Sequence, residues 1–394
     1  MIQPSILILA LKAVAQLVIS CIVGYTFTKK GIITQSTLTA LSRLVYYVFQ
    51  PCLLFVKVAT TVASPGHGIE KLLILPFFAL LQVFFGIILG KGMEKIVCLE
   101  PGSSDSREVR MGASFGNAGV LPLLFLDAMF SDSDGEHSAS TAVAYVSFYL
   151  LGWSPTFWTV GYMLLAGKPQ VDAAVLPSSE LNNAQKSSAP PSPVKQEASW
   201  WRRTMASPTT KKIFAPPFLG CVAGMIIGVI PWTYRVLLAE DAPLSPLLDS
   251  LQGIGRGYLP SAILVLAGSL AKAQSASESS LSDGAQGYGV FYRKVIAIMI
   301  SRFLVMPAVT MGTLVAGFKA GVIPYERLLW FVLLLEGCMP PAQSSVVILQ
   351  MEERPDLSAS MAKTLTTVYL LSAIPVAVLL SMMLQFVTKA DTIL

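Results

Sequence analysis

Two stretches decide the fold of this chain, SFGNAGVLPLL at residues 114–124 and LLLEGCMPPAQSS at residues 333–345. Each lies inside a long apolar segment and places glycine, proline and an amide side chain where a regular membrane helix would continue. Proline removes a backbone donor and clashes with the preceding turn, so Pro122 and the pair Pro340 and Pro341 predict broken helices. Within a bilayer, broken backbone is stable only where it is buried in protein or lines a cavity.

The rest of the chain is a series of apolar segments of membrane-spanning length. Hydrophobic residues make up 54% of the chain and charged residues only 13%, against roughly 25% charged residues in soluble proteins. A bilayer requires about 20 apolar residues per helical span. Segments of this kind lie at 5–27, 37–62, 71–92, 109–130, 139–166, 213–231, 247–272, 292–318, 325–350 and 359–387. We therefore expect an all-α integral membrane protein of about ten transmembrane helices, with the lipid bilayer as its surroundings.

The segment 167–212 separates two halves of the chain. It contains PSSELNNAQKSSAPPSPVKQ, whose composition is typical of a disordered linker. Of the 28 Lys and Arg residues, 18 lie in odd-numbered connections and 5 in even-numbered connections or termini. The positive-inside rule then predicts a cytosolic linker and both termini on the opposite side. The formal charge of +5 is small and spread over short connections, which argues against a nucleic-acid partner.

The two halves, 1–166 and 213–394, resemble each other weakly. The second and seventh predicted spans each contain a proline, Pro51 and Pro260, preceded by an arginine, Arg43 and Arg256. The fourth and ninth spans are the interrupted ones. Because five spans are an odd number, two five-helix repeats must have opposite orientations, which is the inverted-repeat architecture of many secondary transporters.

The two breaks are the candidate substrate site. Half-helix N-termini near the bilayer centre present free N–H groups and a partial positive charge to an anion. The residues that we expect to line this site are Gly116, Asn117, Pro122, Pro340, Pro341, Gln343 and Ser344. Two alternatives stay open: the prolines only kink packed helices, and the amides only satisfy the broken backbone.

Glu336 is an ionisable residue inside the ninth predicted span. A buried carboxyl there is a functional-site hypothesis by default, and proton coupling is its natural role. The alternative is a structural ion pair with an intramembrane cation such as Arg256 or Arg302. The sequence favours neither.

Two apparent enzyme motifs are better explained by helix packing. GASFG at 112–116 matches the pattern of serine hydrolases, but neither His67 nor His137 lies in a span, so Ser114 has no evident base. GIGRG at 253–257 lacks the strand and the acidic residue of a dinucleotide fingerprint. These glycines, like Gly220, Gly224 and Gly228, fit close helix contacts. We expect no enzyme, no cofactor and no metal site.

The residues as a whole resemble the PIN-LIKES (PILS) branch of the auxin efflux carrier superfamily. The resemblance rests on LSRLVYYVFQPCLL (41–54), SFGNAGVLPLL (114–124), DAPLSPLLDSLQGIGRGYLPSAILVLAGSLAK (241–272) and LLLEGCMPPAQSS (333–345). It implies ten helices with the broken fourth and ninth crossing, residence in the endoplasmic reticulum membrane, and auxin or a related indole carboxylate as substrate. It implies that Gly116, Asn117 and Pro122 form one half of the crossover and that Pro340, Pro341 and Gln343 form the other.

The chain departs from that family at three positions of the second break. Gln343 stands where the family usually has Met, Ser344 where it has Asn, and Glu336 where it has an uncharged glutamine. We therefore predict a secondary transporter of a small organic anion, most simply indole-3-acetic acid, with protons as a coupling ion. A carrier of another organic carboxylate and a membrane sensor that does not transport are the alternatives. A homodimer is compatible with either.

Overall fold

The computed structural model describes residues 8, 15, 19, 22–63, 72–119, 121–122, 125–126, 136–166, 216–239, 241–279 and 284–389. All regular elements in these residues are helices, which confirms the predicted all-α class. Their one β contact is an isolated antiparallel bridge between Gly116 and Pro341. The predicted linker at 167–212 lies outside the described residues.

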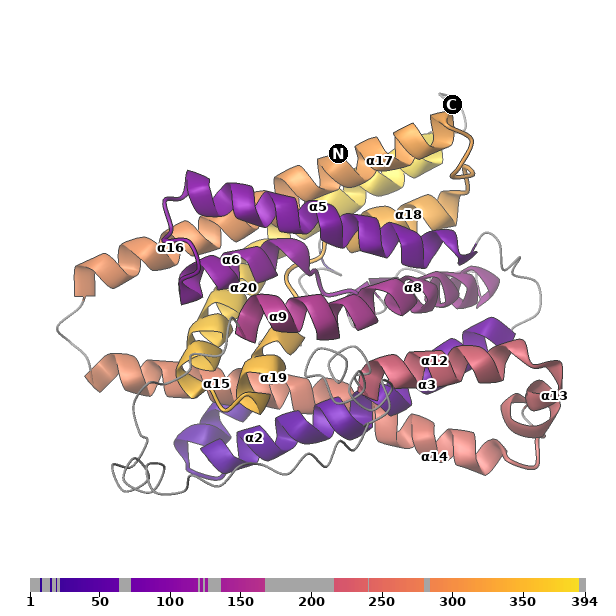
Figure 1. Cartoon of the computed structure of the whole chain (residues 1–394), viewed down its shortest axis with the longest axis horizontal. Helices are drawn as coiled ribbons and strands as arrows, with labels where there is room; N and C mark the ends of the chain where they lie inside the picture. The colour runs from indigo at the N-terminus through magenta and orange to yellow at the C-terminus, as the bar shows by residue number, and fades with distance from the viewer. Residues whose placement is uncertain are drawn as a thin grey trace, which may run out of the picture.

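The helices form two packed groups (Figure 1). The first group contains α2 (Gln35–Leu44), α3 (Gln50–Ala63), α12 (Pro216–Val229), α13 (Pro231–Thr233), α14 (Ser245–Arg256) and α15 (Tyr258–Ser279). The second contains α5 (Ile74–Ile96), α6 (Ser104–Ser114), α8 (Glu136–Thr156), α9 (Tyr162–Ala166), α16 (Gly284–Ile300), α17 (Met306–Lys319), α18 (Arg327–Gly337) and α20 (Pro355–Lys389). α19 (Ser344–Met351) packs against α20 and against α2 and α15 of the first group.

Five helices of the described residues are long and apolar enough to cross a membrane: Gln35–Ala63, Ile74–Ile96, Ser245–Lys272, Gly289–Lys319 and Pro355–Met383. A sixth is the pair Pro216–Val229 and Pro231–Leu238, which bends by 89°. Two further predicted spans, 109–130 and 325–350, fall on broken helices, 139–166 falls on α8 and α9, and most of 5–27 lies outside the described residues. The count of ten and the inverted repeat therefore stay predictions.

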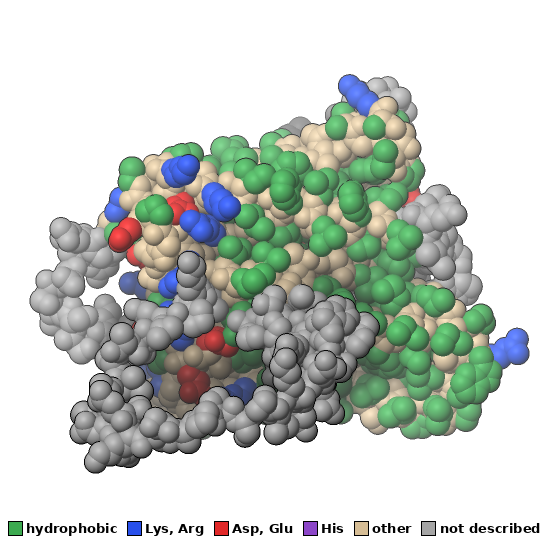
Figure 2. Space-filling view, in the orientation of Figure 1, with side chains coloured by type: hydrophobic (Ala, Val, Ile, Leu, Met, Phe, Trp, Pro, Cys, Tyr) green, Lys and Arg blue, Asp and Glu red, His purple; other side chains and the backbone are tan. Residues whose placement is uncertain are grey.

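The surface has the polarity of a membrane protein. Figure 2 shows hydrophobic side chains over the middle of the second group and charged side chains at the end where α5 ends and α6 and α16 begin. Large apolar side chains such as Phe77, Phe84 and Leu304 are exposed. Apolar surface on this scale requires lipid rather than water around it.

Short π-helical segments precede two prolines of the long helices and accommodate the backbone hydrogen bonds that these prolines cannot donate. η1 (Val45–Phe49) and η4 (Ser301–Val305) each end two residues before a proline, Pro51 and Pro307. Proline cannot donate to the carbonyl one turn earlier, and a widened turn redistributes the hydrogen bonds around that gap. η4 contains Arg302, so the widened turn lies where the candidate site is built. Two more segments of this kind are η2 (Phe157–Gly161) and η3 (Tyr234–Leu238).

Glycines of α12 allow close contact with α3. A Cβ atom added to Gly224 would lie 2.6 Å from the Phe55 carbonyl oxygen, and one on Gly228 would lie 2.6 Å from the Val62 Cβ atom. Gly220 faces the Pro51 backbone in the same way. The interpretation of this glycine series as a helix-packing motif is therefore confirmed.

We expect Gly224→Val to lower the thermal stability of the detergent-solubilised protein, because overpacking costs about 1–3 kcal/mol. The matched control is Gly253→Ala in α14, where no described atom lies within 4 Å of an added Cβ atom, so the close-contact interpretation of GIGRG is wrong for this glycine. That variant should keep or raise Tm, since alanine favours a helix over glycine. Equal Tm values for the two variants would contradict this packing account.

Candidate functional site

The two broken helices cross at their interruptions. α6 ends at Ser114, and α18 and α19 are separated by residues 338–343. The Asn117 N–H donates to the Pro340 carbonyl at 2.7 Å, and the Ala342 N–H donates to the Phe115 carbonyl at 2.9 Å. The interruptions lie in the two stretches where the sequence predicts them, and these main-chain hydrogen bonds hold them against each other.

Arg302 occupies the centre of this crossing and is only 2% exposed. Its Nε donates to the Met339 carbonyl at 2.8 Å, and its Nη1 and Nη2 lie 3.5 Å from the Ala113 carbonyl and 3.4 Å from the Glu336 carbonyl. Ala113 and Glu336 belong to the last turns of α6 and α18, whose carbonyls have no intrahelical partners. One guanidinium thus neutralises the negative ends of two half-helices.

Gly116 has no side chain, and the Arg302 guanidinium occupies the space that a side chain at this position would fill. A Cβ atom built on Gly116 would overlap the Arg302 Nη2 atom. The missing side chain lets the guanidinium approach the backbone of the first break.

Asn117 ties the first break to the second through a tyrosine. Its Nδ2 donates to the Tyr369 hydroxyl at 2.9 Å, and that hydroxyl donates to the Pro341 carbonyl at 2.9 Å. The Tyr369 hydroxyl satisfies the Pro341 carbonyl, and the Asn117 amide contacts that hydroxyl rather than the broken backbone itself. A contact of Asn117 with substrate stays a prediction.

Gln343 and Ser344 begin α19. The Ser344 hydroxyl lies 2.7 Å from the Tyr258 hydroxyl of α15. Gln343 is 3% exposed, and its Nε2 has no hydrogen-bond partner among the described residues. Pro122 is buried in helical backbone beyond the first break, as expected for a proline in an opening turn. Among the described residues, the site thus contains a buried amide donor without a hydrogen-bond acceptor.

Glu336 is 2% exposed, and neither of its carboxylate oxygens has a hydrogen-bond partner in the part of the chain that the structure describes. Arg302 interacts with this carboxylate electrostatically but donates to the main-chain carbonyl of Glu336 instead. Arg256 lies exposed at the end of α14. The described ion pairs do not include Glu336.

A second polar network lies beside the crossing and was not predicted. The Tyr149 hydroxyl donates to Gln82 Oε1 at 2.5 Å, and Gln82 Nε2 donates to Thr310 Oγ1 and to the Leu333 carbonyl at 3.1 and 3.2 Å. These bonds join α5, α8, α17 and α18. Gln82, as a polar residue within an apolar span, was the available signal, whereas a tyrosine in such a span gives none.

Ser114 has the environment of a helix residue rather than a nucleophile. Its hydroxyl donates to the Arg110 carbonyl one turn earlier at 2.6 Å. Gly112, in the same motif, packs against Ile298. The side chains of both histidines lie outside the described residues.

We expect Gly116→Ala to lower Tm, because the new methyl group displaces a charged donor whose hydrogen bonds contribute about 1.5–3 kcal/mol. Gly119→Ala is the matched control, since its added Cβ would lie 3.9 Å from the Leu150 methyl groups, an ordinary contact. Thermal unfolding of the two variants in the same detergent measures the difference. A Gly116→Ala protein as stable as the Gly119→Ala protein would overturn the role given to Arg302.

Comparison with known proteins agrees with this architecture. The model of a family described as "Membrane transport protein" matches residues 9–380. The chain is 25% identical to Protein PIN-LIKES 3 of Arabidopsis thaliana over 359 residues, which cover 86% of this chain and 88% of that protein. It is 24% identical to PIN-LIKES 7 and 25% identical to PIN-LIKES 5 of the same plant, with 82% and 77% of this chain and 83% and 79% of those proteins covered. The resemblance to the PIN-LIKES proteins is confirmed. The chain belongs to the membrane transport protein family, which is a family of transporters and not of enzymes.

Proposed function

We propose that this chain is a secondary carrier of a small organic anion, with indole-3-acetate as the first substrate to test, in the endoplasmic reticulum membrane. The family establishes transport across a membrane. The observation that supports an anion is the crossing of two broken helices around a buried guanidinium, with an unpartnered amide donor at the start of α19. The resemblance to PIN-LIKES proteins supports an indole carboxylate as the substrate and the endoplasmic reticulum membrane as the location.

The crossing offers positive potential and a free donor to a carboxylate. Arg302 directs its Nε, Nη1 and Nη2 atoms at backbone carbonyls, so in this proposal it acts on a ligand mainly through its field. Gln343 Nε2 lacks a partner among described atoms, and α19 begins at the next residue with the positive end of its dipole. A carboxylate at this point would accept a hydrogen bond that Gln343 does not make with any residue that the structure describes.

The departures from the family pattern leave an amide in the second break. Where the family usually has Asn, this chain has Ser344, whose hydroxyl lies against Tyr258. The amide of this chain belongs instead to the preceding residue, Gln343. A shift of one residue changes the direction of the donor, so a carboxylate other than indole-3-acetate is the second candidate substrate.

Glu336 couples anion binding to a proton in this proposal. Its carboxylate and that of the substrate compete for the field of the same guanidinium, Arg302. When Glu336 is protonated, this competition ends and the anion binds more tightly. By linkage, the anion equally favours protonation of Glu336, so substrate and proton move in the same direction.

For the orientation of the chain in the membrane and for its oligomeric state, the proposal keeps the expectations drawn from the sequence. We propose that the segment 167–212 lies in the cytosol and that both termini lie in the lumen, because of the distribution of Lys and Arg. A homodimer is part of the proposal. A sensor on the same fold would bind the anion without carrying it.

Uptake of radiolabelled indole-3-acetate into proteoliposomes tests the proposal, with protein-free liposomes as the control for diffusion of the neutral acid.

We expect Gln343→Leu to weaken indole-3-acetate binding about tenfold, because a donor to a charged acceptor is lost. Its Tm should not fall, since the lost Nε2 bonds nothing in the described protein. An unchanged affinity in Gln343→Leu would contradict the role given to Gln343, and binding by the wild type without flux would contradict the carrier model.

We expect Glu336→Gln to abolish the stimulation of uptake by an acidic exterior while leaving gradient-free exchange of substrate largely intact. Glutamine keeps the shape of the protonated carboxyl but cannot release a proton. Initial rates with and without a pH gradient measure the effect. If the wild type itself ignores the gradient, Glu336 is not a coupling residue and the protein is a uniporter.

A further inference from the structure

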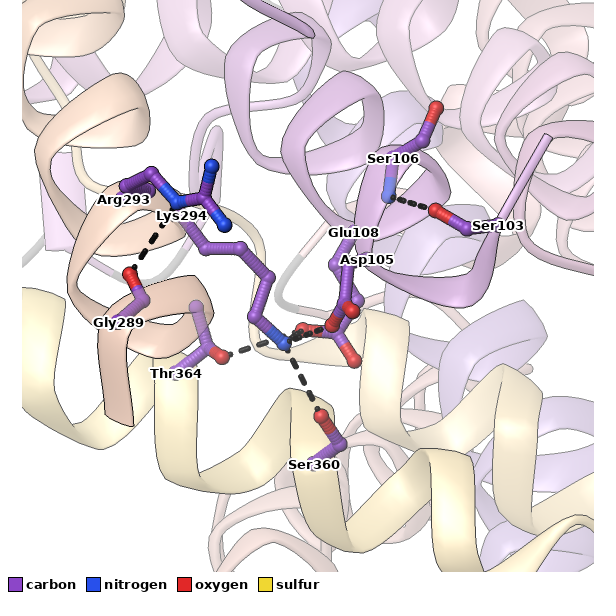
Figure 3. A network of polar contacts seen from close by, with 9 residues as sticks. All are labelled: Ser103, Asp105, Ser106, Glu108, Gly289, Arg293, Lys294, Ser360 and Thr364. Carbon is purple, nitrogen blue, oxygen red and sulfur yellow. Dashed lines mark hydrogen bonds and ion pairs between the residues drawn. The ribbon is translucent and has the colours of Figure 1, made fainter. Parts of the chain in front are cut away.

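A buried lysine outside the crossing joins three helices. Lys294 on α16 is 3% exposed, and its Nζ lies 2.6 Å from Asp105 Oδ1 and 2.8 Å from Glu108 Oε2, both on α6. The same Nζ donates to the Ser360 hydroxyl of α20 at 3.2 Å. Figure 3 shows the ammonium lying between these groups. A buried ion pair of this kind is weak evidence for stability alone, because desolvation offsets much of the attraction.

Helix α6 is held at both ends by one continuous helical run. Lys294 on α16 binds the acidic first turn of α6, and Arg302 in η4 lies against the Ala113 carbonyl in its last turn. Both cations face the same neighbour from positions eight residues apart. Since α6 has 11 residues, these two contacts span nearly its whole length.

Helix α20 is tied to the same point. The Thr364 hydroxyl donates to Glu108 Oε2 at 3.1 Å (Figure 3). Five residues further along α20 lies Tyr369, whose hydroxyl joins Asn117 to the Pro341 carbonyl. The polar cluster of Lys294, Asp105, Glu108, Ser360 and Thr364 therefore connects the three helices that supply Asn117, Arg302 and Tyr369 to the crossing.

We propose that Lys294 is a positioning residue for the crossing: it fixes α6 and α20 relative to α16, and so holds Asn117, Tyr369 and Arg302 in register with the second break. The consequence for ligand affinity rests on the proposed function, whereas the consequence for the crossing itself does not. Loss of the ammonium should loosen the hydrogen bonds of the crossing from a distance.

The test must separate positioning from stability, because Lys294→Met leaves the buried Glu108 carboxylate without its cation. The double variant Lys294→Met/Glu108→Gln removes both buried charges, and Asp105, with a side chain 34% exposed, can reach water. Stability should then recover while the contacts from α16 to α6 and to α20, which the Lys294 ammonium makes, stay absent. A role in stability alone predicts that every property recovers together.

Glu94→Gln/Arg110→Met is the matched control. It removes a second ion pair on α6, between Arg110 Nε and Glu94 Oε2 at 2.5 Å. This pair faces α5, which already packs tightly on α6 where Gly86 meets the Ser114 backbone. We therefore expect α6 to keep its position against α5 when the ion pair is removed.

Full-length protein in lipid nanodiscs would be studied by hydrogen–deuterium exchange, thermal unfolding and indole-3-acetate binding. In the double variant we expect the amides of Asn117 and Ala342 to exchange at least about tenfold faster than in the wild type and in the control, with Tm above that of Lys294→Met. Indole-3-acetate affinity should fall about tenfold. Wild-type exchange at both amides in the double variant would overturn the proposal. Faster exchange in a protein whose wild type binds no indole-3-acetate would support positioning and refute only the substrate.

Discussion

Arg302 is the group on which the candidate site depends. α6 ends at Ser114 and α18 ends at Gly337, and the residues of their last turns, Ala113 and Glu336, are buried inside the protein. Unpaired backbone is costly in a membrane, so such breaks require a compensating donor. The Arg302 guanidinium, carried by a widened π turn, supplies donors to the last turns of α6 and α18 and to Met339 in the loop between α18 and α19. Gly116 lacks a side chain so that this arrangement can close.

The same arrangement pairs the backbone groups of the crossing but leaves two polar side chains without hydrogen bonds among the described residues. Main-chain bonds between residues 115–117 and 340–342 fix the crossing, and Asn117 and Tyr369 reinforce it. The Gln343 amide nitrogen and the Glu336 carboxylate remain without hydrogen bonds in the described residues. Buried polar groups in this condition destabilise a protein unless they serve a ligand or an ion. A carrier needs such groups, because it must bind its cargo without being filled by its own side chains.

Part of the fold and of the candidate site could be predicted from the sequence. Proline and glycine within apolar segments gave both breaks, since these residues act on the backbone locally. The glycine series of α12 predicted a close helix contact, because small residues at helical spacing allow helices to approach in a membrane. The structure shows that α3 is the partner. The identity of the contacts across the crossing was not predictable. Arg302 and Tyr369 lie in helices far from the breaks in sequence, and an arginine in an apolar span does not indicate which carbonyls it binds. Lys294 lies near the start of the predicted span 292–318, and its position there does not indicate the two carboxylates that the fold places around it.

The central claim of the proposed function is that the substrate binds between the two breaks, beside the bridge that joins Gly116 and Pro341. A cryo-electron microscopy reconstruction of the protein in lipid nanodiscs with saturating indole-3-acetate tests this most directly. The account predicts density for the carboxylate within hydrogen-bond distance of Gln343 Nε2, beside the bridge between Gly116 and Pro341. Well-resolved density for the ligand elsewhere, with the crossing unchanged and empty, would contradict it.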